Sequence, residues 1–234
     1  MTTAVPPALP AAARRRHISV VAATSLWAAP LVALAARVLL IPWYQDNQDR
    51  PDNIRYLTEL AAAPVRNDVG AALTFLSAVL FVGAACVLTD IARRRMPRTA
   101  LAAGALVVVG AFGLASISVI SMAFGEMARV EDRAAMVALL DRLMTAPQFA
   151  VYSASLFAGA VGAVLLAIGL YRSRLVPRAA AVLTGIGTAA VMVTAPGPLA
   201  PFIVRSAVLA LAGLAWVAIA ARRVAQDANP HVNG

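Results

Sequence analysis

The sequence contains few of the side chains that catalysis and metal binding require. It has no lysine, one cysteine (Cys86) and two histidines (His17 and His231), which stand near opposite ends of its 234 residues. A single cysteine cannot form a disulfide within the chain or supply a thiolate metal site. Neither histidine has ligand-type neighbours in the sequence, so we expect no metal centre, no cofactor and no catalytic residue.

Charged residues are also scarce, at 13% of the chain, whereas hydrophobic residues make up 61%. Soluble domains have about 25% charged and about 45–50% apolar residues. The mean hydropathy is +0.79, and the apolar residues form runs of about 20, the helix length that crosses a hydrocarbon core of about 30 Å. We therefore predict an all-α, polytopic membrane protein in a lipid bilayer, built as a bundle of six transmembrane helices.

The apolar runs place the six spans. The predicted spans are residues 18–41, 69–91, 99–124, 147–170, 179–195 and 201–221. They form one transmembrane domain, residues 18–223, between a disordered basic tail at residues 1–17 and a C-terminal tail at residues 224–234.

The first span also has features of a secretory signal. Ala33-Leu34-Ala35 is similar to a small-residue cleavage site, and cleavage there would leave five spans. The apolar run continues to Ile41 and ends in an aromatic pair, Trp43 and Tyr44, of the kind that lies at a membrane interface. This continuation favours an uncleaved first span.

Two segments between the spans are charged and predicted to be short amphipathic helices. Asp52 has the residue type of an N-cap for a helix that continues to Ala63 and stops at Pro64. In residues 125–145, apolar side chains recur every three or four positions among charged ones, so one face can lie on the membrane or on the bundle.

The arginines predict the orientation in the membrane. Twelve of them fall on one side of the six-span arrangement, and on the other side six arginines stand among nine acidic residues. Because basic residues in short loops remain in the cytoplasm, the first side is cytoplasmic, with both termini inside and both amphipathic helices at the outer face. The net charge of +9 is thus explained by the arginines at the ends of the spans, and we expect no nucleic-acid partner. The twelve are Arg14, Arg15, Arg16, Arg93, Arg94, Arg95, Arg98, Arg172, Arg174, Arg178, Arg222 and Arg223.

Two arginines inside predicted spans are candidate ligand-binding residues. Arg37 and Arg205 each lie about one turn from the outer end of a span. They can extend to the interface without a partner, or they can face inward and, with Asp68 and Glu126 above them, line an outward-opening pocket for an anionic or polar ligand. Asp90, at the inner end of the second span, is interpreted as an ion-pair partner of the arginines that follow it.

Small and hydroxyl-bearing residues in the spans are interpreted as packing residues. Ser155, Gly159 and Ala163 are spaced four apart, a pattern that lets transmembrane helices approach closely. Ser118 and Thr184 can donate hydrogen bonds to their own helix or to a neighbouring one.

Three stretches resemble a broad group of uncharacterised, chiefly actinobacterial, multi-pass membrane proteins. They are the acidic loop segment Leu57-Thr58-Glu59-Leu60-Ala61-Ala62, the arginine hairpin after the second span, and residues 169–183, GLYRSRLVPRAAAVL. Together they cover most of residues 18–223. The resemblance implies a compact six-helix bundle in a bacterial plasma membrane, and it implies no catalytic residue.

The leading hypothesis is a non-enzymatic membrane protein that binds a small ligand or a partner protein at its outer face. The first alternative is a small-molecule transporter, because the arginine hairpins near residues 93–98 and 172–178 are spaced as in parallel two-helix repeats. The second is a lipid-modifying enzyme that works at the outer interface through Asp68, Glu126 or Glu131.

Overall fold

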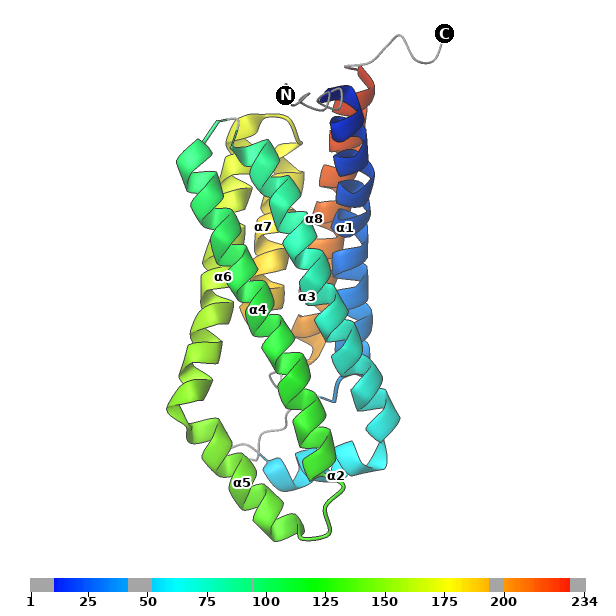
Figure 1. Cartoon of the computed structure of the whole chain (residues 1–234), viewed down its shortest axis with the longest axis vertical. Helices are drawn as coiled ribbons and strands as arrows, with labels where there is room; N and C mark the ends of the chain where they lie inside the picture. Colours follow the sequence, from blue (N-terminus) through cyan, green and yellow to red (C-terminus); the bar gives the residue numbers. More distant parts are fainter. Residues whose placement is uncertain (1–10, 42–51, 94, 194–199, 228–234) are drawn as a thin grey trace, which may run out of the picture.

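The computed structural model describes the backbone of residues 11–41, 52–93, 95–193 and 200–227, and the side chains of residues 24–41, 52–93, 95–193 and 205–220. Within these ranges the fold is all-α, as the sequence predicts (Figure 1). The helices are α1 (Ala11–Leu39), α2 (Asn53–Ala62), α3 (Pro64–Ala92), α4 (Pro97–Met127), α5 (Arg133–Thr145), α6 (Pro147–Ser173), α7 (Arg178–Val193) and α8 (Ala200–Asp227).

The first and last helices extend past the predicted spans. α1 begins at Ala11, inside the segment predicted as a disordered tail, and α8 continues to Asp227. Both extensions are rich in alanine and arginine, which have high helix propensities. Residues 1–10 and 228–234 of the predicted tails, and the aromatic pair at residues 43–44, lie outside the described residues.

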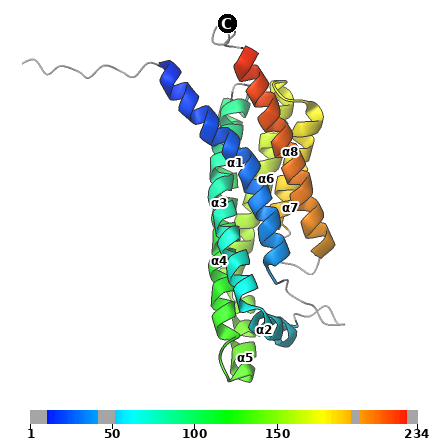
Figure 2. The ribbon, with the colours of Figure 1, turned by 90° about the vertical axis from the view of Figure 1, so that its right-hand side faces the viewer.

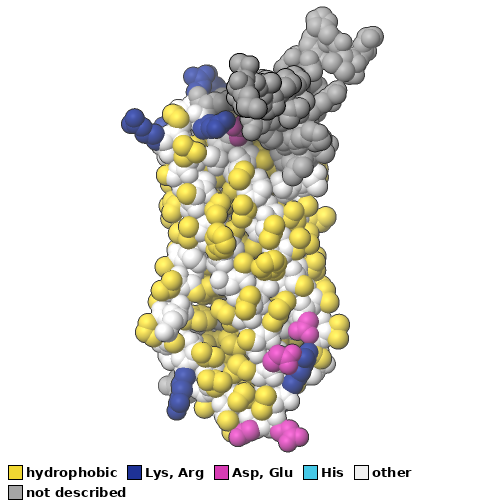
Figure 3. Space-filling model, viewed as in Figure 1, with side chains coloured by type: hydrophobic (Ala, Val, Ile, Leu, Met, Phe, Trp, Pro, Cys, Tyr) yellow, Lys and Arg dark blue, Asp and Glu magenta, His cyan; other side chains and the backbone are white. Residues whose placement is uncertain are grey.

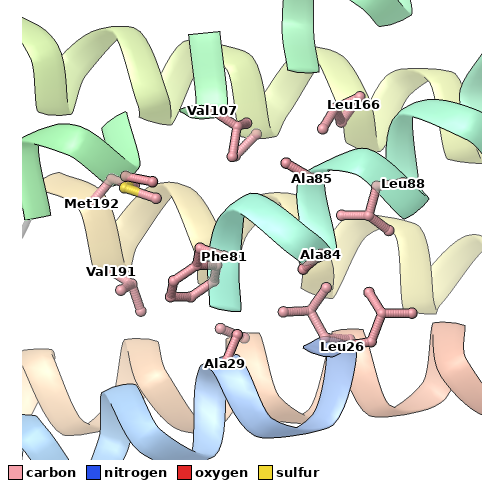
Figure 4. Close-up of a cluster of buried hydrophobic side chains, with 14 of the residues drawn as sticks. Leu26, Ala29, Phe81, Ala84, Ala85, Leu88, Val107, Leu166, Val191 and Met192 are labelled. Atoms are coloured by element: carbon pink, nitrogen blue, oxygen red, sulfur yellow. The ribbon is translucent and has the colours of Figure 1, made fainter. Parts of the chain in front are cut away.

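Six helices form a closed ring. α1 packs on α3, α3 on α4, α4 on α6, α6 on α7 and α7 on α8, and α8 returns to pack on α1 (Figures 1 and 2). α1 begins and α8 ends at the same end of the bundle. The interior is filled mainly by alanine and leucine side chains such as Ala29, Ala84 and Leu88 (Figure 4). Small side chains allow this close packing of helix on helix.

Three helices of the ring are long and apolar enough to cross a membrane. These are α3, α4 and α6, with 29, 31 and 27 residues. The described parts of the other three contain shorter apolar helices, at Thr24–Leu39, Arg178–Val193 and Arg205–Ala220. Large apolar side chains such as Phe112 point outward, and the surface between the two ends of the bundle is largely apolar (Figure 3). These features suggest a membrane protein in a lipid bilayer.

Prolines mark where three helices of the ring begin. Pro64, Pro97 and Pro147 stand in the first turns of α3, α4 and α6. A proline fits there because the N–H group that it lacks would have no partner within the helix. α3 therefore begins at Pro64, five residues before the predicted start of the second span.

The two short helices lie at one end of the ring, which we call the cap end. α2 has the predicted N-cap, since Asp52 Oδ1 accepts a hydrogen bond from Arg55 N at 3.0 Å. α5 begins at Arg133 and not near residue 125, because α4 continues to Met127 and Asp132 caps α5 through Ala135 N at 3.0 Å.

A second apolar cluster holds α2 and α5 against the end of α4. Tyr56 of α2 meets Phe124 of α4 edge to face, with 6.3 Å between ring centroids. Leu57 and Leu60 of α2 and Leu140 of α5 are also buried in this cluster. Leu140 is the one residue of α5 that is fully buried, and the partly buried Met136, Val137 and Met144 of α5 pack against the same cluster.

Candidate functional site

The first turn of α3 connects three helices at the cap end. Arg66 donates from Nε to Leu39 O at 3.0 Å and from Nη2 to Val38 O at 3.1 Å. These carbonyls lie in the last turn of α1, where backbone oxygens have no partner within the helix. Arg66 therefore caps the C-terminus of α1 and ties it to α3.

The next two residues of α3 contact α4. Asn67 is buried and donates from Nδ2 to Ser121 O at 3.1 Å, while its Oδ1 has no hydrogen-bond partner among the described residues. Asp68 Oδ2 forms an ion pair with Arg129 Nη2 at 3.0 Å, and Arg129 Nη1 pairs with Glu126 Oε1 at 2.6 Å. Two of the predicted site residues, Asp68 and Glu126, are thus brought together by Arg129.

Arg129 was not among the predicted site residues. Its ion pair with Glu126 has the spacing of three residues that is common on helix surfaces, a sequence signal that the prediction did not use, whereas its contact with Asp68 joins residues 61 positions apart. We call Asp68, Glu126 and Arg129 the charged triad. All three side chains are at least 45% exposed, so the charged triad is open to solvent or to a ligand.

Arg37 of α1 lies apart from the charged triad, near α6 and α7. Its Nη2 donates to Val191 O at 3.3 Å, in the last turn of α7. A guanidinium at this position satisfies a carbonyl and interacts favourably with the negative end of the helix dipole. Tyr152 of α6 is near enough to interact electrostatically with Arg37, and its buried hydroxyl has no hydrogen-bond partner among the described residues.

The fourth predicted residue, Arg205, stands exposed in the described beginning of α8, with no ion pair to a described acid. The four predicted residues therefore lie at three separate places. Asp68 and Glu126 share Arg129, Arg37 binds the end of α7, and Arg205 lies on the surface. No contact within the described chain joins either predicted arginine to Asp68 or Glu126.

The middle of the bundle contains a small cavity of about 10 Å³. Its lining includes Phe81 and Leu88 of α3 and Leu166 of α6, with two threonines of α7, Thr184 and Thr188. Figure 4 shows the surrounding apolar side chains. The Oγ1 atoms of both threonines are buried without a hydrogen-bond partner among the described residues, so the sequence-based expectation that Thr184 donates to a carbonyl is wrong for this conformation. Ser118, by contrast, donates to Ala71 O of α3 at 2.8 Å, as expected.

Replacing Thr184 and Thr188 together with valine is expected to raise stability. Valine has nearly the same shape, and its methyl group removes a buried hydroxyl that lacks a partner, which costs about 1 kcal/mol each in proteins. The measurement is the thermal unfolding midpoint of the purified protein in detergent. Thr99→Val, at an exposed position of α4, is the matched control and should change the midpoint little. A lower midpoint in the double variant would mean that the hydroxyls have partners, such as water in the cavity.

No group of three or more histidine, cysteine, aspartate and glutamate side chains that could hold a metal ion occurs in the described part of the chain. Cys86 is exposed on α3 and free. The charged triad contains two carboxylates, but both accept hydrogen bonds from Arg129.

Comparison with known proteins identifies a family and no activity. The family described as a domain of unknown function (DUF4386) matches residues 18–223, which include all of α2 to α7 and most of α1 and α8. Neither the curated proteins nor the solved structures contain a match to the chain. The matched range agrees with the resemblance to proteins of unknown function that the sequence indicated.

Proposed function

We propose that this chain, which belongs to the DUF4386 family, is a six-span protein of a bacterial plasma membrane that binds a partner protein or small ligand at its cap end. It has both termini in the cytoplasm and performs no catalysis of its own. The proposal has two parts, the placement in the membrane and the binding at the cap end, and they rest on different observations.

The ring supports six crossings. A 16-residue helix such as α7 is about 24 Å long, and a bilayer with a core of about 30 Å can accommodate a span of this length by thinning locally. α7 packs between α6 and α8 as a full member of the ring. α1 begins and α8 ends at one end of the bundle (Figure 1), which agrees with an even number of crossings. The excess of arginine at that end supports a cytoplasmic orientation.

The observation that carries the binding part is the contrast between the interior and the cap end. Inside the bundle, Ser118 donates to a backbone carbonyl of the neighbouring helix α3. At the cap end, α5 instead exposes Leu139 and Leu143 one turn apart, with the charged Arg142 between them. Exposed apolar side chains framed by charges are typical of binding surfaces.

The experiment is photo-crosslinking in native membranes. A photo-reactive amino acid is placed at Leu139 on α5, and in matched chains at Phe112, on the apolar side of α4, and at Arg174, at the opposite end. The proposal predicts an adduct of discrete mass at position 139 and none at 112 or 174 beyond lipid. Equal adducts at all three positions, or none at 139, would contradict binding at the cap end.

The predicted arginines are tested in the same assay. If Arg37 and Arg205 contribute to the ligand site, Arg37→Gln with Arg205→Gln should reduce the adduct at position 139 while membrane insertion is unchanged. Arg205→Gln alone is the cleaner variant, because Arg37 also caps α7. An undiminished adduct in both variants would remove the arginines from the site and leave the charged triad and α5 as its components.

A transporter built on parallel two-helix repeats is the second candidate, favoured by one observation. The cavity at Thr184 and Thr188 places two hydroxyls without partners at the centre of the ring. At about 10 Å³ it holds at most one water molecule, and the side chains around it are otherwise apolar. A substrate path through the ring would require the helices to separate, in which case Thr184→Cys, in a chain whose exposed Cys86 is replaced by alanine, would react with small water-soluble thiol reagents. Absence of reaction favours the binding protein.

A further inference from the structure

The turn between α3 and α4 and the turn between α6 and α7 lie side by side at the end of the bundle opposite α2 and α5. Arg172 Nη1 approaches Met96 Sδ at 4.0 Å, which joins the two turns. Gly169 packs against Ala92 so closely that a Cβ atom on Gly169 would lie 2.8 Å from Ala92 Cβ. We call this the arginine end.

The arginine end carries a concentrated positive charge with little compensation. Its described arginines are all exposed, and a single described acid, Asp90, lies among them. Asp90 pairs with Arg93 at 2.5 Å, as the sequence predicts, which leaves the other five without an ion pair to a described acid. Figure 3 shows basic side chains at this end, above the apolar surface. The six arginines are Arg93, Arg95, Arg98, Arg172, Arg174 and Arg178.

The backbone and one aromatic ring hold several of these arginines in place. Arg174 has φ 56°, a left-handed conformation that ends α6. The Arg178 guanidinium lies over the ring of Tyr171, 5.3 Å from its centroid, where the ring attracts a cation. The two turns thus present arginines from four helix ends on one surface.

We propose that the two turns together bind the phosphate of an anionic phospholipid headgroup. A guanidinium group can bind two phosphate oxygens at once through two N–H groups, and basic residues near a membrane surface attract anionic lipids. The site rests on the membrane placement proposed above, but not on any ligand at the cap end.

The surface next to the arginines fits the acyl chains of the same lipid. Leu101 lies three residues after Arg98, and Ile168 lies four residues before Arg172, so each is about one helical turn toward the bundle middle. Both side chains are exposed, at 60% and 41%. Phosphate-binding groups directly beside outward-facing apolar side chains match a lipid, whereas a free phosphate would need the arginines alone.

The test measures the thermal unfolding midpoint of the purified full-length protein in neutral detergent. Three additions are compared: phosphatidylglycerol, phosphatidylcholine and inorganic phosphate. The proposal predicts a saturable rise with phosphatidylglycerol, weaker at high salt, and no comparable rise with the other two. An equal rise with inorganic phosphate would contradict a lipid site, and no rise with phosphatidylglycerol would contradict any anion site here.

Matched variants place the effect on the arginine end. The triple variant Arg95→Gln, Arg98→Gln and Arg172→Gln should lose the rise. The control triple Arg55→Gln, Arg142→Gln and Arg205→Gln removes the same charge from exposed positions elsewhere and should keep it. Equal rises in both triples would overturn the site. A failed crosslink at position 139 would leave this result unaffected, so the two proposals fail separately.

Discussion

The Gly159→Val variant is expected to lose the packing of α4 on α6 and to unfold or aggregate in detergent. Gly159 and Gly110 face each other where these helices cross. A Cβ atom on Gly159 would lie 2.6 Å from Gly110 Cα, and one on Gly110 would lie 2.5 Å from Gly159 Cα. Both obstacles are backbone atoms, which cannot rotate away, so the helices would have to separate.

The expected loss of stability is large because separating α4 from α6 disrupts more than the single contact between the two glycines. Overpacking a well-packed interior costs about 1–3 kcal/mol where side chains can adjust. Here the obstacles are backbone atoms, so no side-chain adjustment can relieve the clash. We expect a loss at or above the upper value, measured by the unfolding midpoint and by size-exclusion chromatography. Ala105→Val, at an exposed position of α4, the helix that α6 crosses, is the control. A Gly159→Val protein as stable as the control would contradict the observed crossing.

The Tyr56→Ala variant is expected to release α2 and α5 from the ring while leaving the ring folded. Tyr56 is 2% exposed and contributes the largest side chain that α2 buries. Replacing a buried aromatic residue with alanine costs about 3–5 kcal/mol. The second apolar cluster contains few side chains to compensate for this loss, so the cap end should open locally.

Hydrogen exchange of the purified protein measures this release. Amides of α2 and α5 should lose protection in Tyr56→Ala, while those of α3 and α4 away from the cap end keep theirs. Ile54→Ala, in the same helix at a side chain that is 64% exposed, should leave protection unchanged. Equal protection of α2 in the two variants would show that the cluster does not hold the cap end together.

The helices could be predicted because long apolar helices leave a strong local signal in the sequence. Runs of apolar residues located all six helices of the ring, and Asp52 located the start of α2. The start of α5 was misplaced because Val130 fits the helical spacing of the apolar residues that follow it, although it lies in the turn between α4 and α5. Asp132 caps α5 and so marks its start. The spacing of apolar residues alone does not distinguish such a new start from a continuous helix.

For the candidate site, the sequence indicated which residues to consider but not how they contact one another. Nothing in the sequence relates Arg37 to Val191, 154 positions away, because that contact depends on how the closed ring brings the last turns of α1 and α7 close to each other. The direction in which an arginine faces from a span is equally invisible to its local sequence. The spacing of Gly159 did predict a helix contact, but the facing residue, Gly110, follows only from which two helices cross.

The most direct test of the central claim, a six-span ring with its arginine end in the cytoplasm, is cysteine labelling in intact bacterial cells. Cys86→Ala removes the single natural cysteine, and Glu131→Cys or Arg174→Cys then places one thiol at an exposed position of either end. With a membrane-impermeant maleimide, we predict labelling of Glu131→Cys in intact cells and of Arg174→Cys only after permeabilisation. Labelling of Arg174→Cys in intact cells would contradict the proposed orientation, and labelling of both would contradict the six crossings.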